Sequence, residues 1–243
     1  MMRCGPYFDS MAKKLGLKIG LGVLGVLIVA FAVFSAYIWF SGGSGEPTAA
    51  AVAERSEPRD EAARLFEVIP GSAEAQFIIG EVLRGRQNDV VGSTDQIDGS
   101  FSLGFSNGAV EIGQFVINLR SIQTDDEMRD RTIRTMILQT NRDEFEFSTF
   151  TPTSVEGAPS SISVGDTLQL RVTGDLAIRD VTRPVDFDME LTVQSEQEIT
   201  GTAAAVITWD EFDITIPYVG GNSIVASVED EVRLRMEFLA RAN

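Results

Sequence analysis

The stretch "TLQLRVTGDLAIRDVTRPVDFDMELTV", Thr167–Val193, decides the fold, because apolar and polar residues alternate along most of its length. A period of two is typical of strands with one buried face and one solvated face. The alternation therefore predicts two strands joined through "RDVTRP", Arg179–Pro184, with a dry face that must be covered.

The same period recurs in short segments from Leu65 to the end of the chain, which favours a string of strands over alternating strands and helices. Opposite faces carry charged residues such as Asp186, Asp188 and Glu190. Antiparallel sheets with this pattern bury the dry face, and closing the sheet removes exposed edges. A barrel and a sandwich are the two folds predicted. The dry faces contain Phe101, Phe105, Phe145, Phe147, Leu170, Val172, Phe187, Met189, Ala203, Ala205, Trp209, Met236 and Phe238.

One segment, Asp125–Ile137, is predicted to be helical. Thr124 and Glu127 have the spacing of a capping box, and acidic residues fill the first turn. The apolar face of this helix consists of Ile133, Met136 and Ile137. A short helix with such a face can cover one mouth of a barrel.

The N-terminal part of the chain predicts a membrane anchor. Ile19–Phe40 runs 22 residues without a charge, enough to cross about 30 Å of hydrocarbon as a helix. A signal peptide has a shorter apolar region of about 7 to 15 residues and a cleavage site close behind it. Here the A-x-A of Ala51–Ala53 lies well beyond the span. An uncleaved anchor is therefore the favoured interpretation.

Charge and composition on either side of the span predict its orientation and a linker on its C-terminal side. The four basic residues before the span, Arg3, Lys13, Lys14 and Lys18, favour a cytoplasmic N-terminus and a periplasmic or extracellular barrel. Residues 41–64 are rich in Gly, Ser, Pro, Ala and charge, which is typical of a flexible linker. The predicted organisation is a cytoplasmic flank (1–18), an anchor (19–40), a linker (41–64) and a β-domain (65–243).

Several classes of function are disfavoured by residue content. The chain has no histidine, so Ser-His and Cys-His catalytic arrangements are absent, and no acidic cluster has the spacing of a metal site. A net charge of −16 argues against nucleic-acid binding. The single cysteine, Cys4, precedes the span, so the β-domain has no disulfide. The small residues of Gly16-x-x-x-Gly20 and Ala32-x-x-x-Ala36 would suit a homodimer packed through the anchor.

Five blocks in order resemble the YceI-like family of exported, lipocalin-like barrels that bind polyisoprenoid lipids. They are "VVGSTDQIDGSF" (Val90–Phe101), "INLRSIQTDDEMRDRTI" (Ile117–Ile133), "GDLAIRDVTRPVDFDMEL" (Gly174–Leu191), "WDEFDITIP" (Trp209–Pro217) and "VEDEVRLRMEFLA" (Val228–Ala240). The chain departs from the family where histidines are often found, because Arg131 and Thr132 follow the Arg129–Asp130 pair here. Any role of histidine in the family does not extend to this chain.

The resemblance implies an all-β, antiparallel, lipocalin-like barrel with one short helix. Many relatives have cleaved signal peptides, whereas the uncharged span predicts that this chain keeps an N-terminal anchor. The resemblance also implies a non-enzymatic protein without a catalytic cofactor, whose partners are an isoprenoid lipid or quinone and the membrane. Alternation alone does not decide between this hypothesis and a filled barrel that serves as an interaction or sensing module, because both have the same pattern. Under the lipid hypothesis the ligand-binding residues are Phe101, Phe105, Phe145, Phe147, Leu170, Val172, Phe187, Met189, Ala205, Trp209, Met236 and Phe238.

Overall fold

A computed structural model describes residues 25–37, 46–55, 58, 62–217 and 225–242. The chain divides into two compact units, Met1–Ser41 and Gly42–Asn243. Residues 25–37 of the first unit are helical. Within the described ranges no helix has the length and hydropathy needed to cross a membrane. The expected anchor, 19–40, extends on both sides into residues outside the described ranges, so it stays a prediction.

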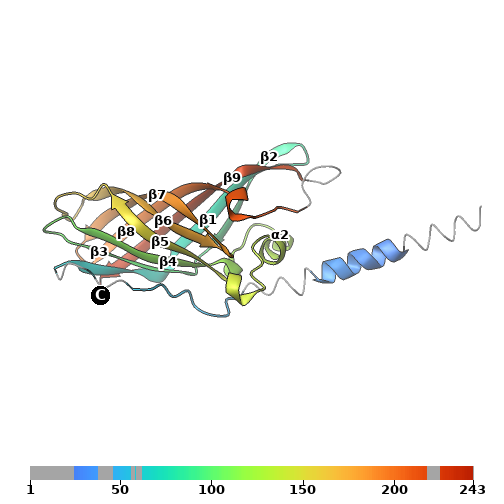
Figure 1. Cartoon of the computed structure of the whole chain (residues 1–243), viewed down its shortest axis with the longest axis horizontal. Helices are drawn as coiled ribbons and strands as arrows, with labels where there is room; N and C mark the ends of the chain where they lie inside the picture. Colours follow the sequence, from blue (N-terminus) through green and yellow to red (C-terminus); the bar gives the residue numbers. More distant parts are fainter. Residues whose placement is uncertain (1–24, 38–45, 56–57, 59–61, 218–224, 243) are drawn as a thin grey trace, which may run out of the picture. The chain divides into compact units, whose positions relative to one another are not determined.

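The second unit is an antiparallel β-barrel, one of the two folds that the alternation predicts (Figure 1). Eight of the strands in the described ranges close on themselves in the order β1-β3-β4-β5-β6-β7-β8-β9, because β1 also pairs with β9. The short β2 extends one edge of β1. The strands are β1 (Arg64–Leu83), β2 (Arg86–Thr94), β3 (Ile97–Leu103), β4 (Val110–Asn118), β5 (Phe147–Glu156), β6 (Thr167–Ile178), β7 (Val181–Ser195), β8 (Glu198–Thr208) and β9 (Val225–Ala242).

The hairpin of β6 and β7 has the alternation that its sequence predicts. In β6 every second residue from Leu168 to Ile178 is buried, and the pairing is unbroken from Thr167↔Thr192 to Ile178↔Val181. The two strands are joined by Arg179 and Asp180, and Arg179 has a φ of 56°. Positive φ is uncommon for residues other than glycine and marks a tight turn.

One half of the barrel interior is filled by aromatic rings, which we call the aromatic plug: Phe66, Phe101, Phe115 and Phe238. Phe66 and Phe101 stack at 5.5 Å between ring centroids, and Phe238 lies 6.0 Å from Phe101 and 5.8 Å from Phe115. Gly201 on β8 makes room for this packing, because a Cβ there would meet the Phe238 ring at 2.1 Å. The plug occupies the half of the barrel that contains β3 and the C-terminal end of β9 (Figure 1).

Short helices lie at the opposite end of the barrel from the plug. α2 (Glu127–Thr132) continues directly into a π-helical turn, η2 (Ile133–Ile137), so the predicted helix exists in two pieces and begins later than Asp125. The described part of the chain also has single 3₁₀ turns: η1 (Leu119–Ser121) and η3 (Asp143–Phe145) flank these helices in sequence, and η4 (Asp210–Phe212) follows β8.

The predicted cap of α2 is wrong in one respect, since Asp126 and not Thr124 is the N-cap. The Asp126 side chain accepts a hydrogen bond from the Arg129 amide at 2.8 Å. Thr124 instead donates through both its amide and its hydroxyl to Asp130 Oδ1, at 2.7 and 2.6 Å. Because Thr124 is hydrogen-bonded to the buried Asp130 carboxylate, it does not cap the helix. The spacing of residues in the sequence does not reveal this contact.

Residues 46–55, part of the predicted linker, lie along the outside of the barrel (Figure 1) and are called the strap here. The amide of Ala53 donates to Asp98 Oδ2 on β3 at 2.8 Å, and the amide of Glu54 donates to Gln114 Oε1 on β4 at 3.0 Å. Ala53 is buried. The folded unit therefore extends N-terminally beyond the predicted start at residue 65.

A buried carboxylate holds the other end of the strap. Glu146 accepts hydrogen bonds from the amide and hydroxyl of Thr48 and from Asn118 Nδ2, and it lies 3.1 Å from Arg120 Nη1. Burial alone would raise the pKa of Glu146, but the bonds from Thr48 and Asn118 and the charge of Arg120 outweigh it, so the pKa is lowered. Glu146 is therefore charged, and its carboxylate oxygens are hydrogen-bonded. Thr48 of the strap supplies two of these hydrogen bonds.

Candidate functional site

A cavity of about 540 Å³ occupies the half of the barrel that the aromatic plug leaves open. Ligand pockets commonly have volumes of about 300 to 1,000 Å³, so this space is large enough for a small lipid chain. The wall is formed by inward-facing residues of eight of the described strands, all except β3. They include Phe77, Ile79, Val90, Phe115, Ile117, Phe150, Leu176, Ile178, Phe187, Met189, Ala203, Ile207, Val232, Leu234 and Met236.

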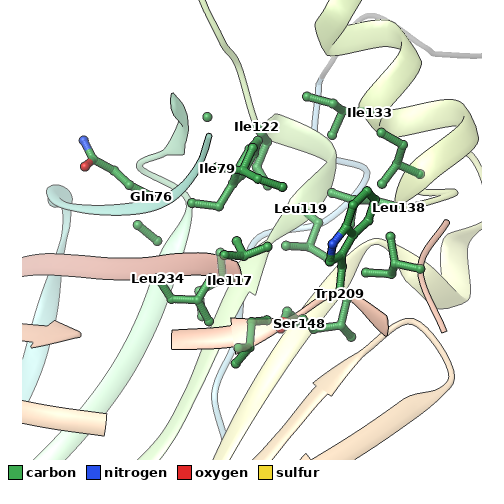
Figure 2. A pocket seen from close by; sticks show the side chains of 18 of the residues that line it. Gln76, Ile79, Ile117, Leu119, Ile122, Ile133, Leu138, Ser148, Trp209 and Leu234 are labelled. Atoms are coloured by element: carbon green, nitrogen blue, oxygen red, sulfur yellow. The ribbon is translucent and has the colours of Figure 1, made fainter. Parts of the chain in front are cut away.

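The end of the cavity near α2 is lined by short segments between strands. Leu119 and Ile122 follow β4, and Ile133, Ile137 and Leu138 come from η2 and its end. Figure 2 shows Leu119, Ile122, Ile133 and Leu138 around the space, with Ile117 and Leu234 from the strands. The apolar face predicted for the helix therefore does cover a barrel mouth, through Ile133 and Ile137 but not Met136.

Two arginines hold these covering segments in place. Arg179, in the β6–β7 turn, donates to the carbonyls of Ile137 at 3.1 Å and Asp213 at 3.2 Å. Arg134 is buried and donates to the Ile122 carbonyl at 3.2 Å. Burial lowers the pKa of Arg134 from its ordinary value, but guanidinium stays charged at any physiological pH. The covering segments are thus held by charge-assisted hydrogen bonds.

The chemistry of the site is that of a container. Its lining is mostly aliphatic and aromatic, and its hydroxyls are already bonded: Ser148 donates to the Ala177 carbonyl at 2.8 Å, and Thr94 pairs with Ser121 at 2.6 Å. Within the described ranges no group of three or more acidic or cysteine side chains is placed to hold a metal ion. Binding of an apolar molecule is what this arrangement can do.

Four of the predicted ligand-binding residues line the cavity: Phe187, Met189, Trp209 and Met236. The other eight lie elsewhere. Phe101 and Phe238 belong to the aromatic plug, and Leu170, Val172 and Ala205 are buried in the hydrophobic core without lining the cavity. Phe105 packs against the outer end of the plug, with its ring centroid 6.5 Å from Phe66. Phe145 is in η3 beneath the Arg142 guanidinium, and Phe147 begins β5.

The lining of β5 shows why some residues were missed. Its buried positions are Ser148 and Phe150, so Phe147 is on the opposite face. A serine on the dry face breaks the apolar pattern. Only Phe150 indicates which residues of this strand face inward.

The other missed residues lack a clean alternation around them. Leu119 and Ile122 follow a strand in a non-repetitive segment. Ile79 on β1 and Val90 on β2 each stand beside a second apolar residue, Ile78 and Val91, so the sequence does not show which of the two faces inward.

Comparisons with known proteins agree with this architecture. A family model described as "YceI-like domain" matches residues 66–240. "Protein YceI" of Shigella flexneri is 31% identical over 113 residues, which cover 46% of this chain and 54% of that protein. "UPF0312 protein YE1254" of Yersinia enterocolitica is 30% identical over 129 residues, covering 51% and 62%. The chain thus spans little more than half the length of these curated relatives.

A solved structure supports the fold independently. The structure of a polyisoprenoid-binding domain from Saccharophagus degradans, implicated in plant cell wall breakdown, matches with a TM-score of 0.56 and 14% identity. The match covers 73% of this chain and 98% of that domain. At this identity the likeness concerns the fold alone. Because the family model accounts for nearly the whole barrel, this chain belongs to the YceI-like domain family.

Proposed function

We propose that this protein is a membrane-tethered, extracytoplasmic, non-enzymatic carrier or sequestering protein for an isoprenoid lipid of the quinone or polyprenyl type. One observation carries the proposal: the barrel is hollow over about 540 Å³ at its α2 end, and that space is lined by apolar side chains. The description of the Saccharophagus degradans domain as polyisoprenoid-binding supports the choice of ligand class. The cavity also weighs against the alternative of a wholly filled barrel.

The energy available in such a cavity is sufficient for binding. At about 25 cal/mol per Å² of apolar surface removed from water, a chain that buries on the order of 300 Å² gains roughly 7 kcal/mol before the costs of association. At the packing density of protein interiors a five-carbon isoprene unit takes on the order of 110 Å³. The cavity of about 540 Å³ therefore suits a chain of about five units.

The tether is supported by the sequence of residues 1–40, in which an uncharged span follows four basic residues. A carrier held at the membrane samples the lipid pool from which it loads. The absence of histidine and the bonded state of the cavity hydroxyls Ser148 and Thr94 support a binding role without catalysis.

One experiment tests both parts of the proposal. The full chain is extracted from membranes in a mild detergent, and its intact mass is measured under native and denaturing conditions. We expect a mass that retains residues 1–40 and, in the native spectrum, an additional mass that is released as an apolar lipid. A mature N-terminus near Ser41 or after Ala53 would refute the tether. A lipid-free protein that also takes up no prenylated quinone would refute the binding role.

A further inference from the structure

Trp209 brings one polar group, its indole N–H, into the wall of the cavity. It follows β8, directly before η4, and its partly buried side chain lines the space. Figure 2 shows its indole ring between the labelled side chains of Leu119 and Leu138 in that view, with the ring nitrogen on the side of Leu119. The indole N–H is a donor only, and buried tryptophans usually satisfy it. In the described part of the chain no acceptor bonds to this nitrogen.

Hydrogen bonds order the main chain at and beside Trp209. Its own carbonyl accepts hydrogen bonds from the amides of Phe212 and Ile214, each at 3.1 Å. Phe212 is fully buried, and the Thr208 amide is bonded to Glu211 Oε2 at 3.0 Å. Because the main chain at Trp209 is ordered in this way, only the indole side chain has to be ordered when a ligand arrives, which favours a specific contact.

The other uncharged side-chain donors in the cavity wall already have protein acceptors. Besides the bonded Ser148 and Thr94, Thr132 donates to the Met128 carbonyl at 2.9 Å. Gln76 Nε2 donates to Glu74 Oε2 at 3.0 Å on the exposed side of β1. Among the polar side chains that line the described cavity, Trp209 is therefore the uncharged donor left for a ligand.

The charged groups of the lining do not suit an anionic head group. Arg129 Nη1 lies 2.6 Å from Asp125 Oδ1, and Arg129 Nη2 lies 3.8 Å from the buried Glu81. Two carboxylates thus neutralise this guanidinium, and Glu81 would repel a phosphate. Arg235 is exposed on the outer face of β9, between Leu234 and Met236, which face inward.

We infer that Trp209 donates a hydrogen bond to a neutral, oxygen-bearing head group, such as a quinone carbonyl, and so places that head group at the α2 end of the cavity with the prenyl chain toward the aromatic plug. The inference rests on the proposed function and narrows its ligand class. It favours prenylated quinones and alcohols over prenyl hydrocarbons, which have no acceptor, and over prenyl diphosphates, which are anionic.

The test uses the full chain, purified in detergent and stripped of lipid. It is offered an equimolar mixture of tetraprenyl benzoquinone and tetraprenyl benzene, which has the same chain and ring without carbonyls. The bound fraction is extracted and quantified by chromatography. We expect the wild type to hold the quinone in about tenfold excess, and Trp209→Phe to reduce this ratio to near one without changing hydrocarbon occupancy. Trp209→Tyr, which keeps a ring-borne donor, should recover part of the preference.

Two further measurements separate a hydrogen bond from a merely structural role. Phe187→Leu removes cavity-lining surface without a polar atom, so it should lower the occupancy of both ligands alike. The infrared carbonyl stretch of the bound quinone should lie at lower frequency in the wild type than in Trp209→Phe. An unchanged ratio together with an unshifted carbonyl band would overturn the inference. If Trp209→Phe does not fold, the wild-type band decides, and a frequency equal to that in hydrocarbon solvent overturns the inference.

A third probe, tetraprenyl diphosphate, tests the charge argument. We expect the wild type to bind it more weakly than the quinone, and a preference for the diphosphate would overturn the assignment of a neutral head group. If the wild type holds neither the quinone nor the hydrocarbon, the proposed function itself fails and the inference fails with it. Retention of the hydrocarbon without any preference for the quinone would leave the proposed function standing and refute only the role of Trp209.

Discussion

Ala203 gives the most direct way to test whether the cavity is the binding site. It lies on β8, opposite Met189 on β7 and Met236 on β9, and all three line the cavity. Replacing Ala203 by Trp directs an indole ring into the hollow half of the barrel. Because the neighbouring side chains are flexible methionines and the space beyond them is open, we expect the barrel to fold with little change in its melting temperature.

The size of the effect comes from a comparison of volumes. At interior packing density a Trp side chain exceeds Ala by about 140 Å³, slightly more than one isoprene unit of about 110 Å³. The variant therefore excludes about one unit from the cavity of about 540 Å³. Five carbons at about 0.8 kcal/mol each make this a loss of up to about 4 kcal/mol, or about a thousandfold in affinity, for a chain that fills the cavity. A chain of three units should bind with nearly unchanged affinity.

The assay measures dissociation constants of benzoquinones that carry two to eight isoprene units, with the full chain in detergent. Val206→Trp is the matched control, because Val206 is on the same strand and is 59% exposed on its outer face. We expect the longest well-bound chain to become shorter by about one unit in Ala203→Trp and to stay the same in Val206→Trp. Equal affinities for five-unit chains in the wild type and Ala203→Trp, with both proteins folded, would refute the assignment of the cavity. If Ala203→Trp unfolds, Ala203→Leu makes the same test with a smaller side chain.

Two further predictions concern buried carboxylates outside the cavity. Glu146→Gln should lower the free energy of unfolding by about 3 kcal/mol at neutral pH, because it leaves Arg120 without its buried charge partner. Since the pKa of Glu146 is lowered in the folded state, its stabilisation is complete above the ordinary value of about 4.5 and is lost as the pH falls through the folded value. Thermal unfolding between pH 7 and pH 3 should therefore show the wild type and Glu146→Gln converging at low pH, and a constant difference would contradict this. Asp130→Asn should cost about 1 to 3 kcal/mol in urea unfolding, because Asp130 accepts both bonds from Thr124, and should leave lipid occupancy intact once folded. Loss of lipid at unchanged stability would give Asp130 a functional role.

The fold could be predicted from sequence where alternation is unbroken, and the hairpin of β6 and β7 is the best case. The site could be predicted only in part, for two physical reasons. Inward faces have the same alternation whether they meet a ring or an empty space, so Phe238 in the plug and Met236 in the cavity wall look alike. What separates them is Gly201, whose missing side chain admits the Phe238 ring. That contact joins residues far apart in sequence.

The strap escaped prediction for a different reason. Its composition is that of a flexible linker, and its hydrogen bonds come mainly from backbone amides, which every non-proline residue has. The specificity lies in the acceptors: Asp98 on β3, Gln114 on β4, and Glu146 directly before β5. A single sequence does not show that these side chains accept hydrogen bonds from residues 46–55. The same limit applies to Asp130. Its hydrogen bonds from Thr124 explain why α2 begins later than the sequence predicts.

The division of the barrel into a plugged half and a hollow half has an energetic reason. Empty apolar cavities made by mutation cost about 24 cal/mol per Å³, so a hollow of about 540 Å³ corresponds to an upper bound of about 13 kcal/mol. This is comparable to the whole net stability of an ordinary domain, about 5 to 15 kcal/mol. A barrel hollow throughout would be difficult to stabilise, and the aromatic plug supplies dense packing that the open half lacks. An apolar ligand that binds only the folded state adds its own binding energy to that stability. Under the proposed function, a bound lipid would complete the core in the open half, so that ligand binding and folding would meet the same packing requirement.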